Sequence, residues 1–179
     1  MKAVQRNLFV AAIVIQLCSL GYVGFLAWYP RARGVEVVVE LQGRDPRSMF
    51  RGNYVALQYP FSRLSRVRFT EEESSRIRNG VPVYVRLERK GDVHQMRDVS
   101  LSAPQKGLFL RGLVDSPSWM LRGGDIVVSY GIEAYFASPT RARELEGKLF
   151  ASVEESERVR YARISIAPDG RAALLGLIE

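Results

Sequence analysis

The sequence predicts an α+β, β-rich protein in which a single N-terminal transmembrane helix precedes one mostly antiparallel β domain, sandwich or barrel-like, with two short helices. Residues 8–29 are apolar and uncharged. The remainder alternates short apolar, β-branched runs with turn-forming Gly, Pro and Asp. A chain of 179 residues leaves room for one domain of roughly 150 residues beyond the helix. We therefore expect a cytoplasmic tip and anchor (1–30), a linker (31–34) and a β-rich domain (35–179).

The apolar segment 8–29 contains 22 residues without a charge. A helix of that length rises about 33 Å, which is enough to cross the hydrocarbon core of a bilayer. The segment ends in Trp28-Tyr29, aromatics typical of the membrane interface, and Pro30 is expected to end the helix. Lys2 and Arg6 precede it, which favours a cytoplasmic amino terminus and a domain on the extracytoplasmic, periplasmic side of the cytoplasmic membrane.

A cleaved signal peptide is the competing interpretation of this segment. The apolar run is longer than a usual signal-peptide core, and the nearest cleavage candidate, Ala32-Arg33-Gly34, is a poor small-x-small site. The only cysteine, Cys18, lies inside the run behind Ile15-Gln16-Leu17, which is not a lipoprotein signal. A lone cysteine also excludes a disulfide framework within the chain.

Local patterns predict the first half of the domain. Val35–Leu41 is rich in valine and predicts a strand, and Gly43–Arg47 predicts a turn. Tyr54–Tyr59 predicts a returning strand whose Val55, Leu57 and Tyr59 share one face. Thr70 and Glu73 form a capping-box pattern, which predicts a short helix reaching Asn79-Gly80.

The second half is predicted to contain six more strands and a helix. Glycine-containing turns separate the pairs of strands, and Gly131 is expected to interrupt one strand with a bulge or a close backbone approach. Ser138-Pro139 is expected to open an amphipathic helix. The predicted strands are Val81–Glu88, Val93–Leu101, Leu108–Val114, Gly124–Phe136, Val159–Ala167 and Arg171–Leu177, and the helix ends near Phe150.

Two sets of residues carry a family resemblance. The first set is Asp45, Pro46, Arg47, Arg51, Gly52, Asn53, Tyr54, Leu57 and Tyr59, and the second is Tyr130, Gly131, Ile132, Glu133, Tyr135, Phe136 and Glu146. With these residues the chain resembles the bacterial GDYXXLXY-signature family. The resemblance implies a membrane-anchored protein without an assigned reaction, often paired with a large multi-pass membrane protein. Asn53 stands where that family usually has aspartate, so a role that needs a carboxylate there is not carried over.

The signature also has a physical interpretation. Gly52 and Asn53 suit a turn that enters a strand, because glycine tolerates positive φ and an Asx side chain caps backbone N–H groups. Arg47 and Arg51 lie four residues apart and are expected to meet Glu133 or Glu146. Three roles stay open for these arginines: a structural ion-pair network, a site for a small anion or carboxylate, and solvated surface charge.

A serine protease is the enzymatic alternative. Ser48-Met49 followed by Gly52-Asn53 looks like the nucleophile region of type I signal peptidases, which use a neutral lysine as the base. Lys90 would be that lysine, but it is predicted at the polar tip of a hairpin, where it stays hydrated and charged. Arg86, at a strand position that favours the interior, cannot act as a base.

The net charge, the single histidine and the spacing of acidic residues narrow the classes of function further. The net charge is +7, and about +5 belongs to the part beyond the anchor, yet the basic residues are scattered, so we expect no nucleic-acid partner. His94 is the only histidine, which excludes a site with two imidazoles, and no metal-loop spacing is present. We expect no cofactor. The sequence predicts an extracytoplasmic interaction or assembly module, held in the lipid bilayer by residues 8–29 and acting with a multi-pass membrane protein or another envelope component.

Overall fold

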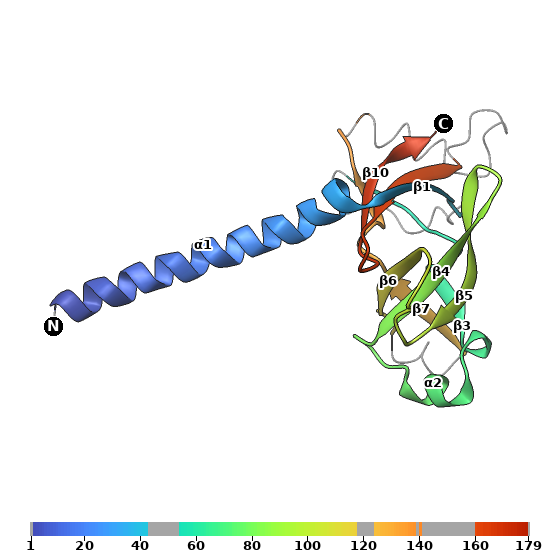
Figure 1. Ribbon diagram of the computed structural model, residues 1–179, viewed down its shortest axis with the longest axis horizontal. Helices are drawn as coiled ribbons and strands as arrows, with labels where there is room; N and C mark the ends of the chain where they lie inside the picture. Colours follow the sequence, from blue (N-terminus) through green and yellow to red (C-terminus); the bar gives the residue numbers. More distant parts are fainter. Residues whose placement is uncertain (1, 43–53, 118–123, 139, 141–159, 179) are drawn as a thin grey trace.

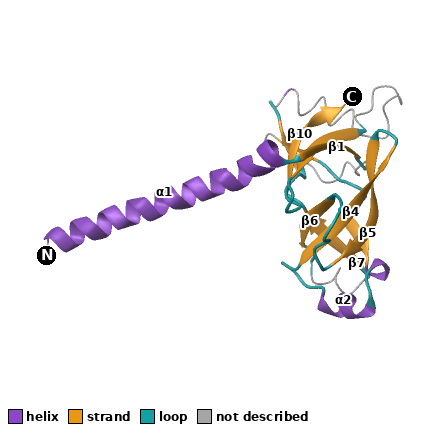
Figure 2. Ribbon diagram, in the orientation of Figure 1, coloured by secondary structure: helices purple, strands orange, loops and turns teal. Residues whose placement is uncertain are grey.

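The computed structural model describes residues 2–42, 54–117, 124–138, 140 and 160–178. A long helix projects from a body made mostly of strands (Figures 1 and 2). The elements in chain order are α1 (Lys2–Arg33), β1 (Val35–Glu40), β2 (Tyr54–Ala56), β3 (Arg63–Ser65), the 3-10 helix η1 (Arg66–Arg68), α2 (Glu71–Arg76), β4 (Pro82–Lys90), β5 (Val93–Ser100), β6 (Phe109–Val114), β7 (Asp125–Ser129), β8 (Ala134–Phe136), β9 (Tyr161–Ile166) and β10 (Ala172–Ile178).

The described strands form one large sheet and one small one. The large sheet has eight strands in the order β10-β9-β1-β5-β4-β6-β7-β3, and β2 pairs with β8 in the second sheet. The pairing is antiparallel except between β1 and β5, where Val39 lies opposite His94. The predicted fold class, one apolar N-terminal helix followed by a mostly antiparallel β-rich domain, is confirmed.

Helix α1 continues through Pro30 to Arg33, so the prediction that Pro30 ends it is wrong. A proline removes one N–H donor and crowds the preceding turn, but it does not stop the residues after it from remaining helical. The Pro30 carbonyl accepts a hydrogen bond from the Gly34 N–H at 3.0 Å, which completes the last turn. Only Gly34 therefore separates the helix from β1.

The strand predicted over 54–59 is shorter than expected, although its alternation is confirmed. β2 ends at Ala56, and the Leu57 N–H donates to the Glu133 carbonyl at 2.7 Å, the next position in the β2–β8 register. Val55, Leu57 and Tyr59 are buried. The short strand β3 and helix η1, which follow, were not predicted from the sequence.

The turn and capping residues correctly predicted several of the other elements. Thr70 and Glu73 make both hydrogen bonds of the capping box, although α2 ends at Arg76 rather than at the predicted Asn79-Gly80. Gly91 and Gly170 have φ values of 63° and 82° in the two predicted hairpin turns. The predicted helix beginning at Ser138-Pro139 falls on residues 139 and 141–159, which lie outside the described residues.

The hydrophobic core lies inside the β domain, while α1 contributes little to it. Most large apolar side chains of α1 are exposed, including Leu8 at 66% and Phe9 at 67%. The core contains large, fully buried side chains from several strands and from the segments that join them. These are Tyr59, Phe61, Leu64, Leu110, Ile126, Ile132, Ile164 and Ile166.

Candidate functional site

Tyr59, from the signature, is fully buried and is held at both its backbone and its hydroxyl. The Tyr59 hydroxyl donates to the Ile132 carbonyl at 2.9 Å, and its N–H donates to the Ser62 Oγ at 3.1 Å. Its ring stacks on Phe61, with the centroids 5.1 Å apart. Burial raises the pKa of Tyr59, and the charge of Glu133 raises it further. The side chain is therefore a neutral hydrogen-bond donor within the core.

Tyr130 joins the same two chain segments in the opposite direction. Its hydroxyl donates to the Phe61 carbonyl at 2.9 Å, and its ring meets Phe61 edge to face at 5.2 Å. Burial raises the pKa of Tyr130 well above its ordinary value, and the charge of Glu133 adds to this effect. We name Tyr59, Phe61, Tyr130 and Ile132 the tyrosine latch, because two buried hydroxyls join chain segments about 70 residues apart in sequence.

Glu133 fixes the bend next to the tyrosine latch. Its carboxylate accepts hydrogen bonds from the N–H groups of Tyr130 at 2.5 Å and Gly131 at 2.9 Å, with the Ser129 hydroxyl 3.4 Å away. Gly131 has a φ of 79°, which a residue with a side chain adopts only under strain. The bend separates β7, in the large sheet, from β8, in the small sheet. The interruption predicted at Gly131 is thus a change of sheet rather than a bulge within one strand.

The structure brings part of the predicted site together. Leu57, Tyr59, Gly131 and Glu133 meet around the bend, and the β2–β8 register places Tyr54 opposite Phe136 and Val55 opposite Tyr135. Asp45, Pro46, Arg47, Ser48, Arg51, Gly52, Asn53 and Glu146 lie outside the described residues. The ion pairs predicted for the two signature arginines therefore stay predictions.

The lysine of the proposed protease dyad is described, whereas Ser48 is not. Lys90 is the exposed last residue of β4, beside the tight turn at Gly91. Arg86 is half-buried, and its Nη1 lies 3.5 Å from the Asp98 carboxylate. Among the described residues, no group of three or more His, Cys, Asp or Glu side chains is placed to hold a metal ion.

The sequence analysis recognised only part of the tyrosine latch and its hydrogen-bond partners. Tyr130 and Ile132 were noted only as part of the second block that resembles the family, and Phe61 and Ser62 were not considered. The signal available was that Phe61 lies two residues after Tyr59 and that Tyr130 directly precedes Gly131. Their contacts depend on long-range packing that neither a helical nor a strand period reveals.

A second cluster joins the end of α1 to the closing hairpin of the domain. The buried Pro30 carbonyl accepts a hydrogen bond from the Ser165 hydroxyl on β9 at 2.6 Å. The Arg171 guanidinium lies 5.3 Å from the Tyr29 ring centroid, and its Nε pairs with the Asp169 carboxylate at 2.6 Å. We name Tyr29, Pro30, Gly34, Ser165 and Arg171 the anchor joint, since they fix the helix to the sheet.

A groove of about 390 Å³ opens beside the anchor joint. Its walls come from the last turns of α1, from the bend at Gly131, from β8 and from β10. Phe136 on its rim is 77% exposed. The lining residues are Leu26, Ala27, Pro30, Arg31, Gly131, Ala134, Tyr135, Phe136, Ala172, Ala173 and Leu174.

Replacing Glu133 by glutamine is expected to lower the free energy of unfolding by about 1–3 kcal/mol. The amide keeps one acceptor oxygen, but its NH₂ group would face a backbone N–H that donates to the carboxylate in the native chain. Urea unfolding of the full chain in detergent micelles would measure the loss. The control is Asp125→Asn at an exposed strand position, and an equal effect of both substitutions would contradict the assigned role of Glu133.

The fold and these two clusters define a class of protein. It is a β-rich domain preceded by one helix long and apolar enough to cross a membrane, with its signature tyrosine used inside the core. The chain belongs to the GDYXXLXY family: the family model described as GDYXXLXY protein matches residues 16–177, from within α1 to β10. Neither a search of curated proteins nor a search of solved structures found a match.

Proposed function

We propose that this protein is a membrane-anchored, extracytoplasmic assembly module that acts with another integral membrane or envelope protein. The observation that carries the proposal is the anchor joint. A single glycine separates α1 from β1, and the last helical turn packs against β9 and β10. The anchor therefore presents the domain to the membrane surface in one orientation, which a module that binds a membrane neighbour requires.

The joint favours a retained anchor over a cleaved signal peptide. Leu26 and Tyr29 are half-buried and Pro30 is buried, so one side of the helix end belongs to the domain. Cleavage after this segment would remove the acceptor of the Ser165 hydroxyl, and Ser165 is only 1% exposed. A buried donor without its acceptor costs roughly 1–3 kcal/mol.

The described signature residues support a binding module rather than an enzyme. The hydroxyls of Tyr59 and Tyr130 are used within the fold, as is the Glu133 carboxylate. The groove beside the anchor joint offers Tyr135, Phe136 and Leu174 at the level where α1 meets the domain. An apolar surface at this level suits a partner that is itself in the membrane or close to it.

The extracytoplasmic placement rests on Lys2 and Arg6 ahead of the apolar segment. A reporter that is active only outside the cytoplasm, fused after Glu179, is expected to be active. A reporter that is active only in the cytoplasm should be inactive at the same position, and the opposite result would contradict the orientation.

Site-specific photo-crosslinking in intact cells tests the assembly role. A photoreactive residue at Tyr135, in the wall of the groove, is expected to give a discrete adduct with one integral membrane or envelope protein. The same residue at Lys90, on the exposed hairpin, serves as the matched control. Absence of an adduct from both Tyr135 and Tyr54, or equal adducts from Tyr135 and Lys90, would contradict the proposal.

A further inference from the structure

We propose that a second surface of the domain, formed by the closing hairpin turn, β6 and the turn at residues 78–81, lies against the anionic lipid surface of the membrane that α1 crosses. This inference rests on the membrane anchoring in the proposed function and adds a partner to it. The partner is the lipid surface itself, and the surface in question shares only Arg31 with the groove that contains Tyr135.

The first strand begins at the level of the lipid headgroups. Tyr29 is the last residue of the uncharged segment, and Val35 follows six residues later, which is about 9 Å at 1.5 Å per residue. The headgroup layer on each side of a bilayer is roughly 5–7 Å thick. Because only Gly34 separates α1 from β1, the domain starts at the outer edge of that layer.

One long side of the domain faces the bilayer. Figure 1 shows that α1 runs crosswise to the long direction of the β domain. β6 and the closing hairpin lie on the side of the domain from which the helix leaves. A helix that spans the membrane therefore places this side along the membrane surface rather than away from it. The tip of the β4–β5 hairpin is drawn on the side away from α1.

A chain of contacts connects the anchor joint to this side. Arg171 of the closing hairpin lies over the Tyr29 ring. The Gly170 carbonyl accepts a hydrogen bond from the Arg111 N–H on β6 at 2.7 Å, and the Val114 carbonyl at the end of β6 accepts one from the Gly80 N–H at 2.9 Å. These contacts connect the end of α1 to the turn at residues 78–81 through the closing hairpin and β6.

Exposed basic side chains follow this path. They are Arg31 and Arg33 at the helix end, Lys106 ahead of β6, Arg111 on β6, and Arg78 in the turn. We name these five residues the basic face. Arg171 is excluded because its charge is paired with Asp169. The exposed Asp115 after β6 offsets only one of the five positive charges. Basic residues this close to a bilayer are attracted to anionic headgroups.

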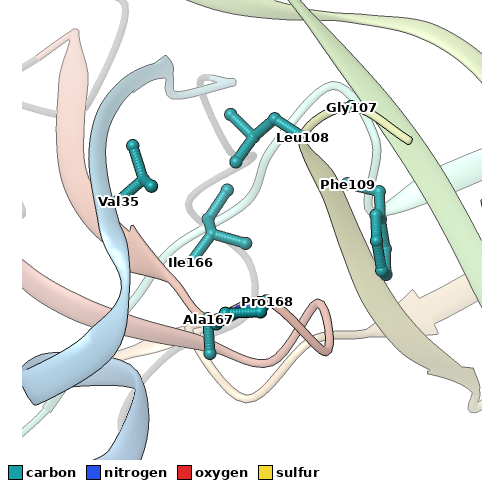
Figure 3. A pocket seen from close by; sticks show the side chains of 7 residues that line it. All are labelled: Val35, Gly107, Leu108, Phe109, Ile166, Ala167 and Pro168. Atoms are coloured by element: carbon teal, nitrogen blue, oxygen red, sulfur yellow. The ribbon is translucent and has the colours of Figure 1, made fainter. Parts of the chain in front are cut away.

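An apolar pocket of about 410 Å³ lies within the same surface. Figure 3 shows Val35, Ile166 and Leu108 around it, with Phe109 to one side and Ala167 and Pro168 below. Val35 is 60% exposed, and Leu113 farther along β6 is 47% exposed. Apolar side chains bordered by arginine and lysine are the composition of surfaces that lie in the membrane interface.

Lipid is favoured over a protein partner here for two reasons. The surface continues directly from the segment that crosses the bilayer, so lipid is already present at its edge. Its charge complements anionic headgroups, whereas the groove beside Tyr135 is lined mainly by apolar residues and a single arginine. A protein covering the basic face would have to displace lipid already held close by the anchor joint.

The test uses the full chain with Cys18→Ser and one new cysteine, carrying a fluorophore, at Leu113 or at Lys90. The protein is reconstituted in vesicles of phosphatidylcholine, with or without phosphatidylglycerol, that contain a lipid-borne quencher. We expect about twofold stronger quenching at Leu113 than at Lys90 when phosphatidylglycerol is present, weakening as salt is raised. The double variant Arg78→Glu, Arg111→Glu should lose the part of the quenching that depends on phosphatidylglycerol.

Equal quenching at Leu113 and Lys90, or no dependence on phosphatidylglycerol, would overturn the proposal. Shielding of Leu113 in native membranes but not in vesicles would also overturn it, because a protein would then cover the surface. Carbonate extraction separates this failure from that of the proposed function. Release of the chain from membranes contradicts anchoring, whereas a retained chain with equal quenching contradicts the lipid contact alone.

Discussion

Replacing Tyr59 by alanine is expected to lower the free energy of unfolding by about 3–5 kcal/mol, the range for removing a buried aromatic side chain. Phenylalanine at the same position should cost about 1–3 kcal/mol, because it keeps the ring but leaves the Ile132 carbonyl without its donor. The two values separate the contribution of ring packing against Phe61 from that of the hydroxyl.

Urea unfolding of the full chain in detergent micelles would measure both substitutions. Tyr84→Phe is the matched control, since Tyr84 is half-buried on β4 and packs its ring against Phe109, with the centroids 5.9 Å apart. We expect the control to change stability by less than about 1 kcal/mol. A Tyr59→Phe variant as stable as the control would show that the signature tyrosine is present for a reason other than this hydrogen bond.

The same tyrosines make stability depend on alkaline pH. Because burial raises the pKa of Tyr59 and Tyr130 in the folded state, both stay protonated at a pH where the unfolded chain ionises. Their contribution is complete below the ordinary tyrosine pKa of about 10 and is lost as the pH rises above it. Tyr59→Phe should reduce this loss, and an unchanged alkaline dependence would contradict it.

The sequence was sufficient wherever local chemistry decides the structure. The capping box at Thr70 and Glu73 and the turns at Gly91 and Gly170 were all predictable, because each depends on residues only a few positions apart. Pro30 was misjudged because its effect depends on position. A proline removes the N–H that would bond to the residue four positions earlier, but it leaves the residues after it free to stay helical, and the carbonyl of Pro30 still accepts hydrogen bonds from Gly34 and from Ser165 of the domain.

The candidate site could be recognised from the sequence but not explained by it. Tyr59 belongs to a visible signature, yet its hydroxyl acceptor is 73 residues away and that of Tyr130 is 69 residues away. Glu133 was expected to pair with arginines, and its described partners include backbone N–H groups of its own bend. Periodicity reveals which face of a strand is buried, but it does not reveal what that face meets.

Replacing Gly34 by valine is expected to break the contacts of the anchor joint, while helix α1 and the β domain on either side of it stay folded. A Cβ at Gly34 would overlap the Ser165 Oγ and the Pro30 carbonyl oxygen, and the latter is backbone that cannot turn aside. Overpacking of this kind costs about 1–3 kcal/mol. Because the two atoms that the new Cβ would overlap are hydrogen-bonded to each other, the helix must separate from β9 to relieve the overlap.

The consequence is a change in how the domain is held, which can be measured as the distance between a spin label on α1 and one on β4. In the native chain this distance should have a narrow distribution, and Gly34→Val should broaden it and weaken the crosslink from Tyr135. Gly24→Val is the matched control, because a Cβ at Gly24 has no described atom within 4 Å. If Gly34→Val keeps the narrow distribution, the anchor joint does not orient the domain, and the proposed assembly role loses the observation that carries it.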